Sequence, residues 1–374
     1  MKKKTALLLI SAVLIFYAFG SCSESDSSKE STEIKFAEKF SIEYLKDSIK
    51  VITDADGREF LLLPDEAEAP EGYETLPVIR TPIKNAFFMS TTHIGLLDAI
   101  GVSSVYDSVA AVATEQSQWT NPNIIDRFSS GKLQYIEQTH WSAADIEAVT
   151  KMKPDVVFVG GGNQSGTDIK AQMQDLGITY VVVSEYLESS GTASLEWIKF
   201  FAAFYNLDSE AAAVFEAKTA RMNELHQKAS ELSEEDKPLV AFGLVWDGTV
   251  YVPSADSTSA KEIGMAGGRF YLPDLHGEGS LQIGMEEFVN NARDADILIY
   301  TSMYSYAKNK QMLLDADPLF AEFKAFKNNQ IYVYRDDFYM NSAAIDEKFE
   351  DMVFIIHPEF FTDYELKHFV KLTD

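Results

Sequence analysis

The chain has 374 residues and a formal net charge of −26, with 58 acidic residues against 32 basic ones. This excess of acid excludes a general nucleic-acid footprint, which needs a basic surface, and it opposes adhesion to anionic lipid headgroups. The length predicts about two domains of ordinary size. The chain has a single cysteine, which excludes an intramolecular disulfide.

Residues 1–21 have the layout of a secretory signal. Lysines at positions 2–4 precede an apolar run over 6–19, which is too short and wrongly flanked to span a membrane. Two small residues then lead into Cys22, as in a bacterial lipoprotein signal, where the thiol is lipidated. Phe19 departs from that pattern, and an ordinary cleaved signal with an incidental cysteine is the alternative. We expect Cys22 to anchor the protein in the bacterial cell envelope, on the periplasmic side of a membrane or at the cell surface.

Residues 22–35 are polar and have no apolar periodicity, which predicts a flexible tether. Residues 36–80 predict an N-terminal β extension, because two apolar runs flank a turn that contains an Asp-Gly pair. Strands and helices then alternate, which predicts βαβ units and mainly parallel sheets. We place an N-terminal α/β lobe at 81–193 and a C-terminal α/β lobe at 237–345.

The segment between the two lobes, residues 194–236, interrupts this alternation. Apolar residues recur there at helical spacing, and neither glycine nor proline occurs between positions 194 and 233. The pattern predicts a helical strut that joins the lobes. Residues 346–374 are predicted to form a C-terminal helical segment. The predicted fold class is therefore α/β, with two lobes joined by a long rigid helix and an extra N-terminal β segment.

One pattern occurs twice in the chain. A short amphipathic helix with a glutamate, a polar turn and a fully apolar strand occur around Glu147 and again around Glu287. The first helix leads into a strand at 156–159, and the second leads into a strand at 297–300. The repetition predicts two related lobes. One carboxylate on each lobe fits a docking surface better than a catalytic centre.

Together these features resemble the substrate-binding proteins of bacterial ABC importers for iron–siderophore complexes, haem and cobalamin. The resemblance covers roughly residues 81 to 345, and Asp294 replaces a proline of the family pattern. It implies two α/β lobes joined by one long helix, an ABC importer permease as partner, a small-molecule metal chelate as ligand, no separate cofactor and a monomer. The motifs that carry the resemblance, by their order and spacing, are Leu97–Val102, Glu147–Phe158, Leu176–Val182, Glu262–Gly268, Glu287–Ile299 and Phe326–Val333.

The resemblance implies that Glu147 and Glu287 bind basic pockets on the permease. A carboxylate on an exposed helix can meet an arginine through two hydrogen bonds, and two such points fix an orientation. Two alternatives stay open. Glu147 can instead pair with Lys151 four residues later, whereas Glu287 has no such partner. Glu286 is the docking residue if the helix register shifts by one.

Ligands of open α/β sheets bind beyond the carboxyl ends of the strands. Three of the four tryptophans fall in such loops, where aromatic faces can cover a flat organic chelate. Arg335 is the candidate for pairing with an anionic chelate. For the two histidines and the first tryptophan, a structural role is the alternative. The candidate ligand-binding residues are His93, Trp119, His140, Trp141, Trp246, Tyr304, Arg335 and Tyr339.

We therefore predict a lipid-anchored binding protein, not an enzyme, that delivers a ferric siderophore to an ABC importer. The chain contains no H-E-x-x-H, no G-x-S-x-G and no dinucleotide glycine fingerprint. A cobalamin or haem receptor of the same family is the first alternative. The others are a chelatase-like metal-handling enzyme that uses His93 and His140, a direct binder of free metal, and a surface scavenger without an importer.

Overall fold

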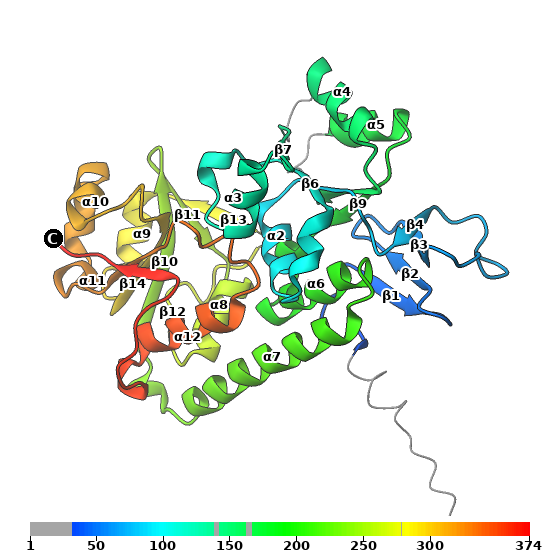
Figure 1. Cartoon of the computed structure of the whole chain (residues 1–374). Helices are drawn as coiled ribbons and strands as arrows, with labels where there is room; N and C mark the ends of the chain where they lie inside the picture. The colour runs from blue at the N-terminus through cyan, green and yellow to red at the C-terminus, as the bar shows by residue number, and fades with distance from the viewer. Residues whose placement is uncertain (1–31, 138–141, 162–166, 278) are drawn as a thin grey trace, which may run out of the picture.

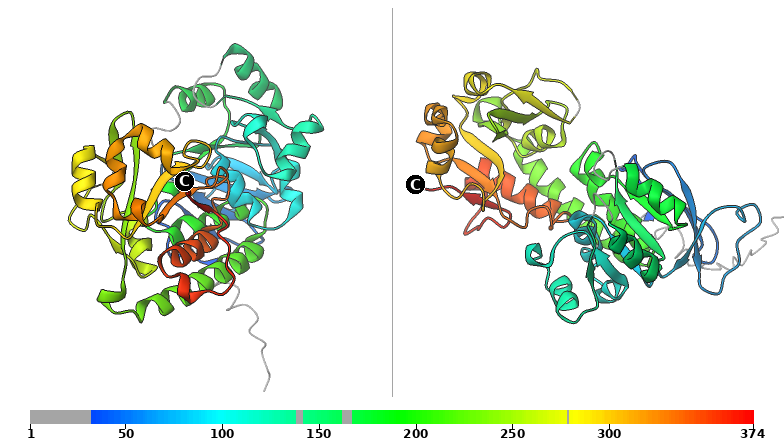
Figure 2. Two further views of the ribbon diagram at one scale, coloured as in Figure 1. Left: turned by 90° about the vertical axis from the view of Figure 1, so that its left-hand side faces the viewer. Right: turned by 90° about the horizontal axis from the view of Figure 1, so that it is seen from above.

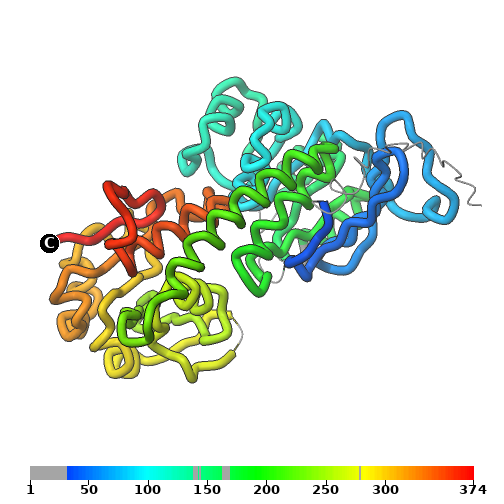
Figure 3. The backbone as a smooth tube through the Cα atoms, turned by 90° about the horizontal axis from the view of Figure 1, so that it is seen from below, coloured from blue at the N-terminus to red at the C-terminus, as the bar shows by residue number. Residues whose placement is uncertain are grey.

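The computed structural model describes residues 32–137, 142–161, 167–277 and 279–374. Two α/β lobes lie beside each other, and helix α7 (Asp208–Ser230) runs along both of them (Figure 1, Figure 3). The predicted two-lobed α/β class is confirmed. Cys22 lies outside the described residues. Within the described ranges, no helix has the length and apolar character needed to cross a membrane.

The sheet of the N-terminal lobe is parallel throughout, in the order β7-β6-β5-β8-β9. Strands β5 and β8 are fully buried, which explains why their sequences are continuously apolar. The strands are β5 (Ala86–Phe88), β6 (Val109–Val112), β7 (Gln134–Tyr135), β8 (Val156–Gly160) and β9 (Tyr180–Val183). The helices are α2 (Thr91–Asp98), α3 (Pro122–Ser129), α4 (Ala143–Met152), α5 (Thr167–Asp175) and α6 (Gly191–Ala203).

The sheet of the C-terminal lobe has a parallel centre and antiparallel edges, in the order β13-β11-β10-β14-β15-β16. The neighbours β10, β14 and β15 are parallel, whereas β11, β13 and β16 join in antiparallel pairs. The strands are β10 (Leu239–Trp246), β11 (Thr249–Pro253), β12 (Arg269–Phe270), β13 (Ser280–Ile283), β14 (Ile297–Met303), β15 (Ile331–Tyr334) and β16 (Phe369–Lys371). The helices are α8 (Thr258–Met265), α9 (Met285–Ala292), α10 (Lys310–Ala316), α11 (Lys324–Lys327) and α12 (Ile345–Ile356).

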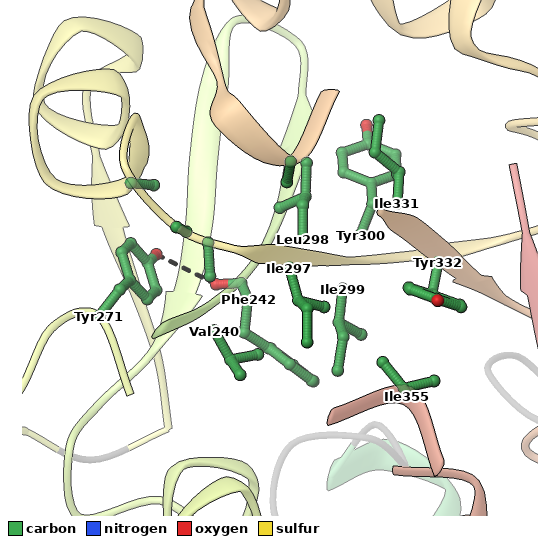
Figure 4. Packing of buried hydrophobic residues seen from close by; sticks show 14 of the residues in the cluster. Val240, Phe242, Tyr271, Ile297, Leu298, Ile299, Tyr300, Ile331, Tyr332 and Ile355 are labelled. Atoms are coloured by element: carbon green, nitrogen blue, oxygen red, sulfur yellow. Dashed lines mark hydrogen bonds between the residues drawn. The ribbon is translucent and has the colours of Figure 1, made fainter. Parts of the chain in front are cut away.

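The core of the C-terminal lobe forms on both faces of this sheet (Figure 4). Consecutive residues of β14 point to opposite faces, so Leu298 packs on one face of the sheet and Ile299 on the other (Figure 4). The hydroxyl of Tyr271 is buried in this core, and it donates a hydrogen bond to the carbonyl oxygen of Phe242 at 3.1 Å.

The N-terminal extension is a four-stranded sheet, β1 (Ser41–Tyr44), β2 (Lys50–Thr53), β3 (Glu59–Pro64) and β4 (Val78–Thr81), at the outer end of the N-terminal lobe (Figure 2). The predicted hairpin between β2 and β3 is confirmed, with Gly57 at φ 76°. One face of the sheet, including Ile52 and Leu62, joins the core of the N-terminal lobe. The extension is therefore part of that lobe's core.

Two buried charges attach the extension to the lobe. Lys50 Nζ donates to the carbonyl oxygen of Ala203 at 3.1 Å and to Asn206 Oδ1 at 2.9 Å, and it pairs with Asp208 Oδ2 at 2.9 Å. Asp54, at the hairpin, accepts the backbone N–H of Val182 at 3.0 Å. Because these groups are buried, removing one of them leaves its hydrogen-bond partner unsatisfied, and water cannot take its place.

The predicted strut over 194–236 is two helices, α6 and α7, rather than one. The chain breaks between them at Asn206, which has φ 57°, where Lys50 binds the free end of α6. Helix α6 is buried on all sides, including Trp197, Ile198 and Phe201, so it belongs to the N-terminal core. Of these two helices, α7 is the one that runs from one lobe to the other.

The C-terminal segment, predicted as helical over 346–374, is only partly so. After α12 the chain turns back, and β16 pairs antiparallel with β15. The buried carboxylate of Asp351 on α12 fixes this return, because it accepts hydrogen bonds from the Tyr364 hydroxyl at 2.6 Å and the His368 backbone N–H at 2.7 Å. The segment therefore completes the C-terminal sheet.

Candidate functional site

A cleft of about 800 Å³ lies between the two lobes. Its size is that of a site for a small organic ligand. Most of its wall comes from the C-terminal lobe, and a short rim comes from the N-terminal lobe. The N-terminal residues are Lys39, Tyr186, Leu187 and Glu188. The C-terminal residues include Phe242, Leu244, Tyr251, Pro253, Ser254, Asp256, Ser257, Thr258, Ser259, Ser280, Thr301, Tyr334 and Tyr339.

Strands β10 and β11 build the C-terminal wall. Phe242 and Leu244 alternate along β10 and so point to the same face, and Tyr251 lies directly opposite Leu244 on β11. The other face of β10 is covered by α9, because a Cβ added at Gly243 would meet Phe288 at 3.5 Å. The cleft and α9 therefore lie on opposite faces of this strand.

A cluster of aromatic rings closes the cleft at the end of β15. Tyr334 stacks on Phe338 with ring centroids 3.8 Å apart, and Tyr339 meets Tyr334 edge to face at 6.1 Å. Burial raises the pKa of both Tyr334 and Tyr339. The two tyrosines are therefore neutral in ordinary buffers, and Tyr339, which is half exposed, offers a rigid aromatic surface to a ligand.

The N-terminal rim follows strand β9. The hydroxyl of Tyr186 donates to the carbonyl oxygen of Gly161 at 2.8 Å, which fixes the ring at the end of the parallel sheet. Gly161 is required there, because a Cβ would collide with the Ser184 hydroxyl. Glu188 is buried beneath the rim, where it accepts hydrogen bonds from Trp197 Nε1 at 2.9 Å and the Lys39 backbone N–H at 3.1 Å.

The lobes also touch at the edges of the cleft. Lys261 Nζ, on α8, donates a hydrogen bond to the carbonyl oxygen of Ser189 at 3.1 Å. The Ser342 hydroxyl donates to the carbonyl oxygen of Thr92 at 2.7 Å. Beside the first contact, burial raises the pKa of Glu262 to about 7, and burial lowers the pKa of Lys348 to about 8. Glu262 also lies against Gly191 of the N-terminal lobe, so the interlobe contact includes a buried carboxyl group.

The structure places His93 in the core of the N-terminal lobe rather than in the cleft. The side chain is 1% exposed and lies beside Phe201, with ring centroids 5.8 Å apart. Burial lowers the pKa of His93 to about 3, so the ring is neutral. Its predicted ligand contact is therefore wrong, because α2 presents this residue to the core.

Of the other predicted ligand residues, Tyr339 lines the cleft, whereas Trp119, Trp246, Tyr304 and Arg335 do not. Trp119 packs in the N-terminal core, and its Nε1 donates to the carbonyl oxygen of Thr114 at 3.0 Å. Trp246 is 66% exposed at the end of β10. Arg335 is half exposed, and its Nε lies 3.8 Å from Asp337 Oδ1. His140 and Trp141 lie outside the described residues.

Glu147 and Glu287 are both exposed, and neither lines the cleft. Glu147 lies on α4 beside a surface hollow of about 520 Å³ that also contains Lys132 and Lys151. Glu287 lies in the first turn of α9, whose buried face consists of Phe288, Val289 and Ala292. Their role in docking stays a prediction.

Several cleft residues were not predicted from the sequence. Lys39 belongs to the extension, and the run from Ser254 to Ser259 connects β11 to the first turn of α8. The serine and threonine run in that segment was a usable signal, because such residues cap helices, and Ser257 does cap α8. Among the described residues, no group of three or more His, Cys, Asp or Glu side chains is placed to hold a metal ion.

The chain was compared with family models, with curated proteins and with solved structures, and each comparison gives a match. Residues 97–338 match the family model described as periplasmic binding protein. An uncharacterized lipoprotein of Methanocaldococcus jannaschii is 32% identical, over 86% of this chain and 78% of its own length. An ABC transporter substrate-binding protein of Listeria monocytogenes has a similar structure, with TM-score 0.56 and 14% identity over 74% of this chain and 99% of its own. The vitamin B12 binding protein BtuF of Vibrio cholerae has a similar structure, with TM-score 0.53 and 14% identity over 75% of this chain and 99% of its own.

Proposed function

The chain belongs to the periplasmic binding protein family, and from this premise we propose that it captures an organic metal chelate between its lobes and delivers it to an ABC importer. A ferric siderophore is the foremost candidate ligand. Cobalamin is the alternative, and the structural likeness to a vitamin B12 binding protein favours it.

The interlobe cleft is the observation that carries this proposal. Its volume of about 800 Å³ suits a ligand much larger than an ion. Four tyrosines in its lining (Tyr186, Tyr251, Tyr334 and Tyr339) offer rigid amphipathic surface, which covers an organic ligand at low entropic cost. Both lobes contribute to the lining, so a bound chelate would bridge them.

The likeness to an uncharacterized lipoprotein supports a lipid anchor in the cell envelope. We propose that Cys22 carries the lipid and that residues 22–35 form the tether. Replacing the thiol (Cys22→Ser) is expected to move the protein from the membrane fraction to the soluble fraction. Persistent membrane association of this variant would contradict the anchor.

The ligand is best identified from protein purified from the organism that makes it. Ferric siderophores, cobalamin and haem have different visible absorption spectra, so a spectrum of the purified protein names the class. The proposal expects one such chromophore, released intact on denaturation. Release of a chemically converted ligand would instead support the chelatase-like alternative. The proposal fails if no chelate co-purifies and none binds on titration.

A further inference from the structure

The first described residues of the chain are fixed to the N-terminal lobe by two buried carboxylates. Glu196, on α6, accepts the backbone N–H groups of Phe36 at 2.7 Å and Ala37 at 2.9 Å. Glu188 accepts those of Glu38 at 3.0 Å and Lys39 at 3.1 Å. Glu196 also accepts the backbone N–H of Lys35, so charge-assisted hydrogen bonds to five successive amides hold this strip of backbone in one place. The strip therefore behaves as a structural part of the rim and not as a loose tail.

Lys39 is the residue that this strip presents to the cleft. It is half-buried, and it is the one Lys or Arg among the described residues that line the cleft. Within the described part of the chain, its ammonium group has no ion-pair partner. The two acidic residues of the lining have other hydrogen-bond partners. Glu188 binds backbone amides and Trp197, and Asp256 lies 2.9 Å from His276 Nδ1.

A lysine ammonium group at the cleft without an ion-pair partner attracts an anionic ligand, because a ligand oxyanion would be its first counter-charge. The opposite wall adds partial charge of the same sign, since the first turn of α8, with Thr258 and Ser259, lines the cleft. The protein as a whole is strongly acidic, and the lining also contains Glu188 and Asp256, so Lys39 and the N-terminus of α8 supply the positive charge of the cleft.

We propose that Lys39 is a specificity determinant that makes the cleft select chelates with negatively charged oxygens, such as catecholates or carboxylates. This inference rests on the proposed function. Lys39 lies outside the residues that match the family model, which begin at 97. The N-terminal extension therefore has a role in ligand choice as well as in the core of its lobe.

The test uses a soluble form of the chain (Cys22→Ser) titrated calorimetrically with two probes, an anionic ferric tris-catecholate and a neutral ferric tris-hydroxamate. The variant Lys39→Gln is expected to weaken tris-catecholate binding about tenfold, the loss of about one charge-assisted hydrogen bond. Binding of the neutral probe should stay within about twofold, and Lys39→Arg should restore the anionic probe. Lys35→Gln is the matched control, because Lys35 lies on the same strip outside the cleft.

Salt gives an independent readout. Tris-catecholate binding to the protein that retains Lys39 should weaken with added NaCl, and less so in Lys39→Gln. Equal loss of both probes in Lys39→Gln would show a packing role and overturn the inference. An unchanged tris-catecholate affinity, or a cleft that binds the neutral probe alone, would overturn it while the proposed function stands. If neither probe nor cobalamin binds, both proposals fail.

Discussion

The two helix–turn–strand units, α4–β8 and α9–β14, share one structural device. In the N-terminal unit, Asp155 Oδ2 accepts the backbone N–H groups of Lys84 at 2.7 Å and Asn85 at 2.9 Å, just before β5. In the C-terminal unit, Asp296 Oδ2 accepts the N–H of Leu239 at 2.8 Å, at the start of β10. Each aspartate ties the start of its own strand to that of the neighbouring strand. The repeated aspartate therefore has a structural explanation in both lobes.

The repeated glutamates, Glu147 and Glu287, share no such structural role. Helix α4 has a capping box between Ser142 and Asp145, and no ion pair joins Glu147 to Lys151 among the described residues. Helix α9 has Gly284 as its N-cap residue and therefore no side-chain cap, and Glu287 in its first turn interacts favourably with the helix dipole. The sequence suggested the reverse, that Glu147 had the competing partner. Glu147 is therefore the sharper test of docking.

Removing the shared aspartates should have the largest effect on stability. Asp155→Ala leaves two backbone N–H groups without an acceptor and is expected to cost about 2 kcal/mol, whereas Asp296→Ala leaves one and should cost about 1 kcal/mol. Urea unfolding measures both. Asp294→Ala, at an exposed position in the same turn, should stay within about 0.5 kcal/mol. Equal values for all three variants would contradict the shared device.

The docking prediction concerns both glutamates together. Glu147→Ala combined with Glu287→Ala should lower transport into vesicles containing the cognate importer by about tenfold or more, because two charged contacts with the permease are lost. Chelate affinity should not change, since neither side chain lines the cleft. The matched control removes two other exposed carboxylates, Asp175 and Asp294, one from each lobe.

The single variants sharpen that experiment. Glu286→Ala, compared with Glu287→Ala, decides which carboxylate of α9 takes part, because both are exposed. Unchanged transport in the double variant at Glu147 and Glu287 would remove the docking assignment and support a scavenger without an importer.

The pH dependence of stability should differ between the unaltered protein and the variant Asp296→Asn. Burial alone would raise the pKa of Asp296, but hydrogen bonds from Lys324 and Leu239 hold it below its ordinary value. The ionised group therefore stabilises the fold above the unfolded pKa of about 3.9, and this contribution is lost as pH falls through the folded pKa. Asp296→Asn should lose less stability than the unaltered protein between about pH 6 and pH 3. An identical fall in both would refute this.

The smallest expected effect is the loss of stability when the charge of Glu287 or Glu147 is removed, because the two residues lie at different positions along their helices. Glu287→Gln removes a charge from the first turn of α9 and should cost about 0.3–1 kcal/mol at low ionic strength. Glu147 lies beyond the first turn of a capped helix, so Glu147→Gln should cost less than about 0.3 kcal/mol. Thermal unfolding at low and high salt makes the comparison, and a larger effect for Glu147 would contradict it.

The alternation of strands and helices was predictable because local apolar periodicity encodes it. The hairpin at 54–57 and the strands at 156–159 and 297–300 were located from such patterns. The break between α6 and α7 was not, because no glycine or proline marks it. It depends on Lys50, a residue more than 150 positions away, which binds Ala203 and Asn206.

The ligand cleft was harder to predict than the fold. Position after a strand suggested both His93 and Tyr339, yet packing of α2 turns the first into the core, and the second lines the cleft. Lys39 and Tyr251 come from segments over 200 residues apart. Residues brought together only by the docking of two lobes leave no local pattern in the sequence.

The central claim, that an organic chelate binds between the lobes, is tested most directly by titrating a matched pair of tyrosine variants with the chelate recovered from the native protein. Tyr339→Ala removes an aromatic ring from the cleft, whereas Tyr306→Ala removes a ring that is 70% exposed and does not line it. We predict about tenfold weaker binding for Tyr339→Ala and unchanged binding for Tyr306→Ala. Equal affinities in both variants, or no binding by the unaltered protein, would contradict the account.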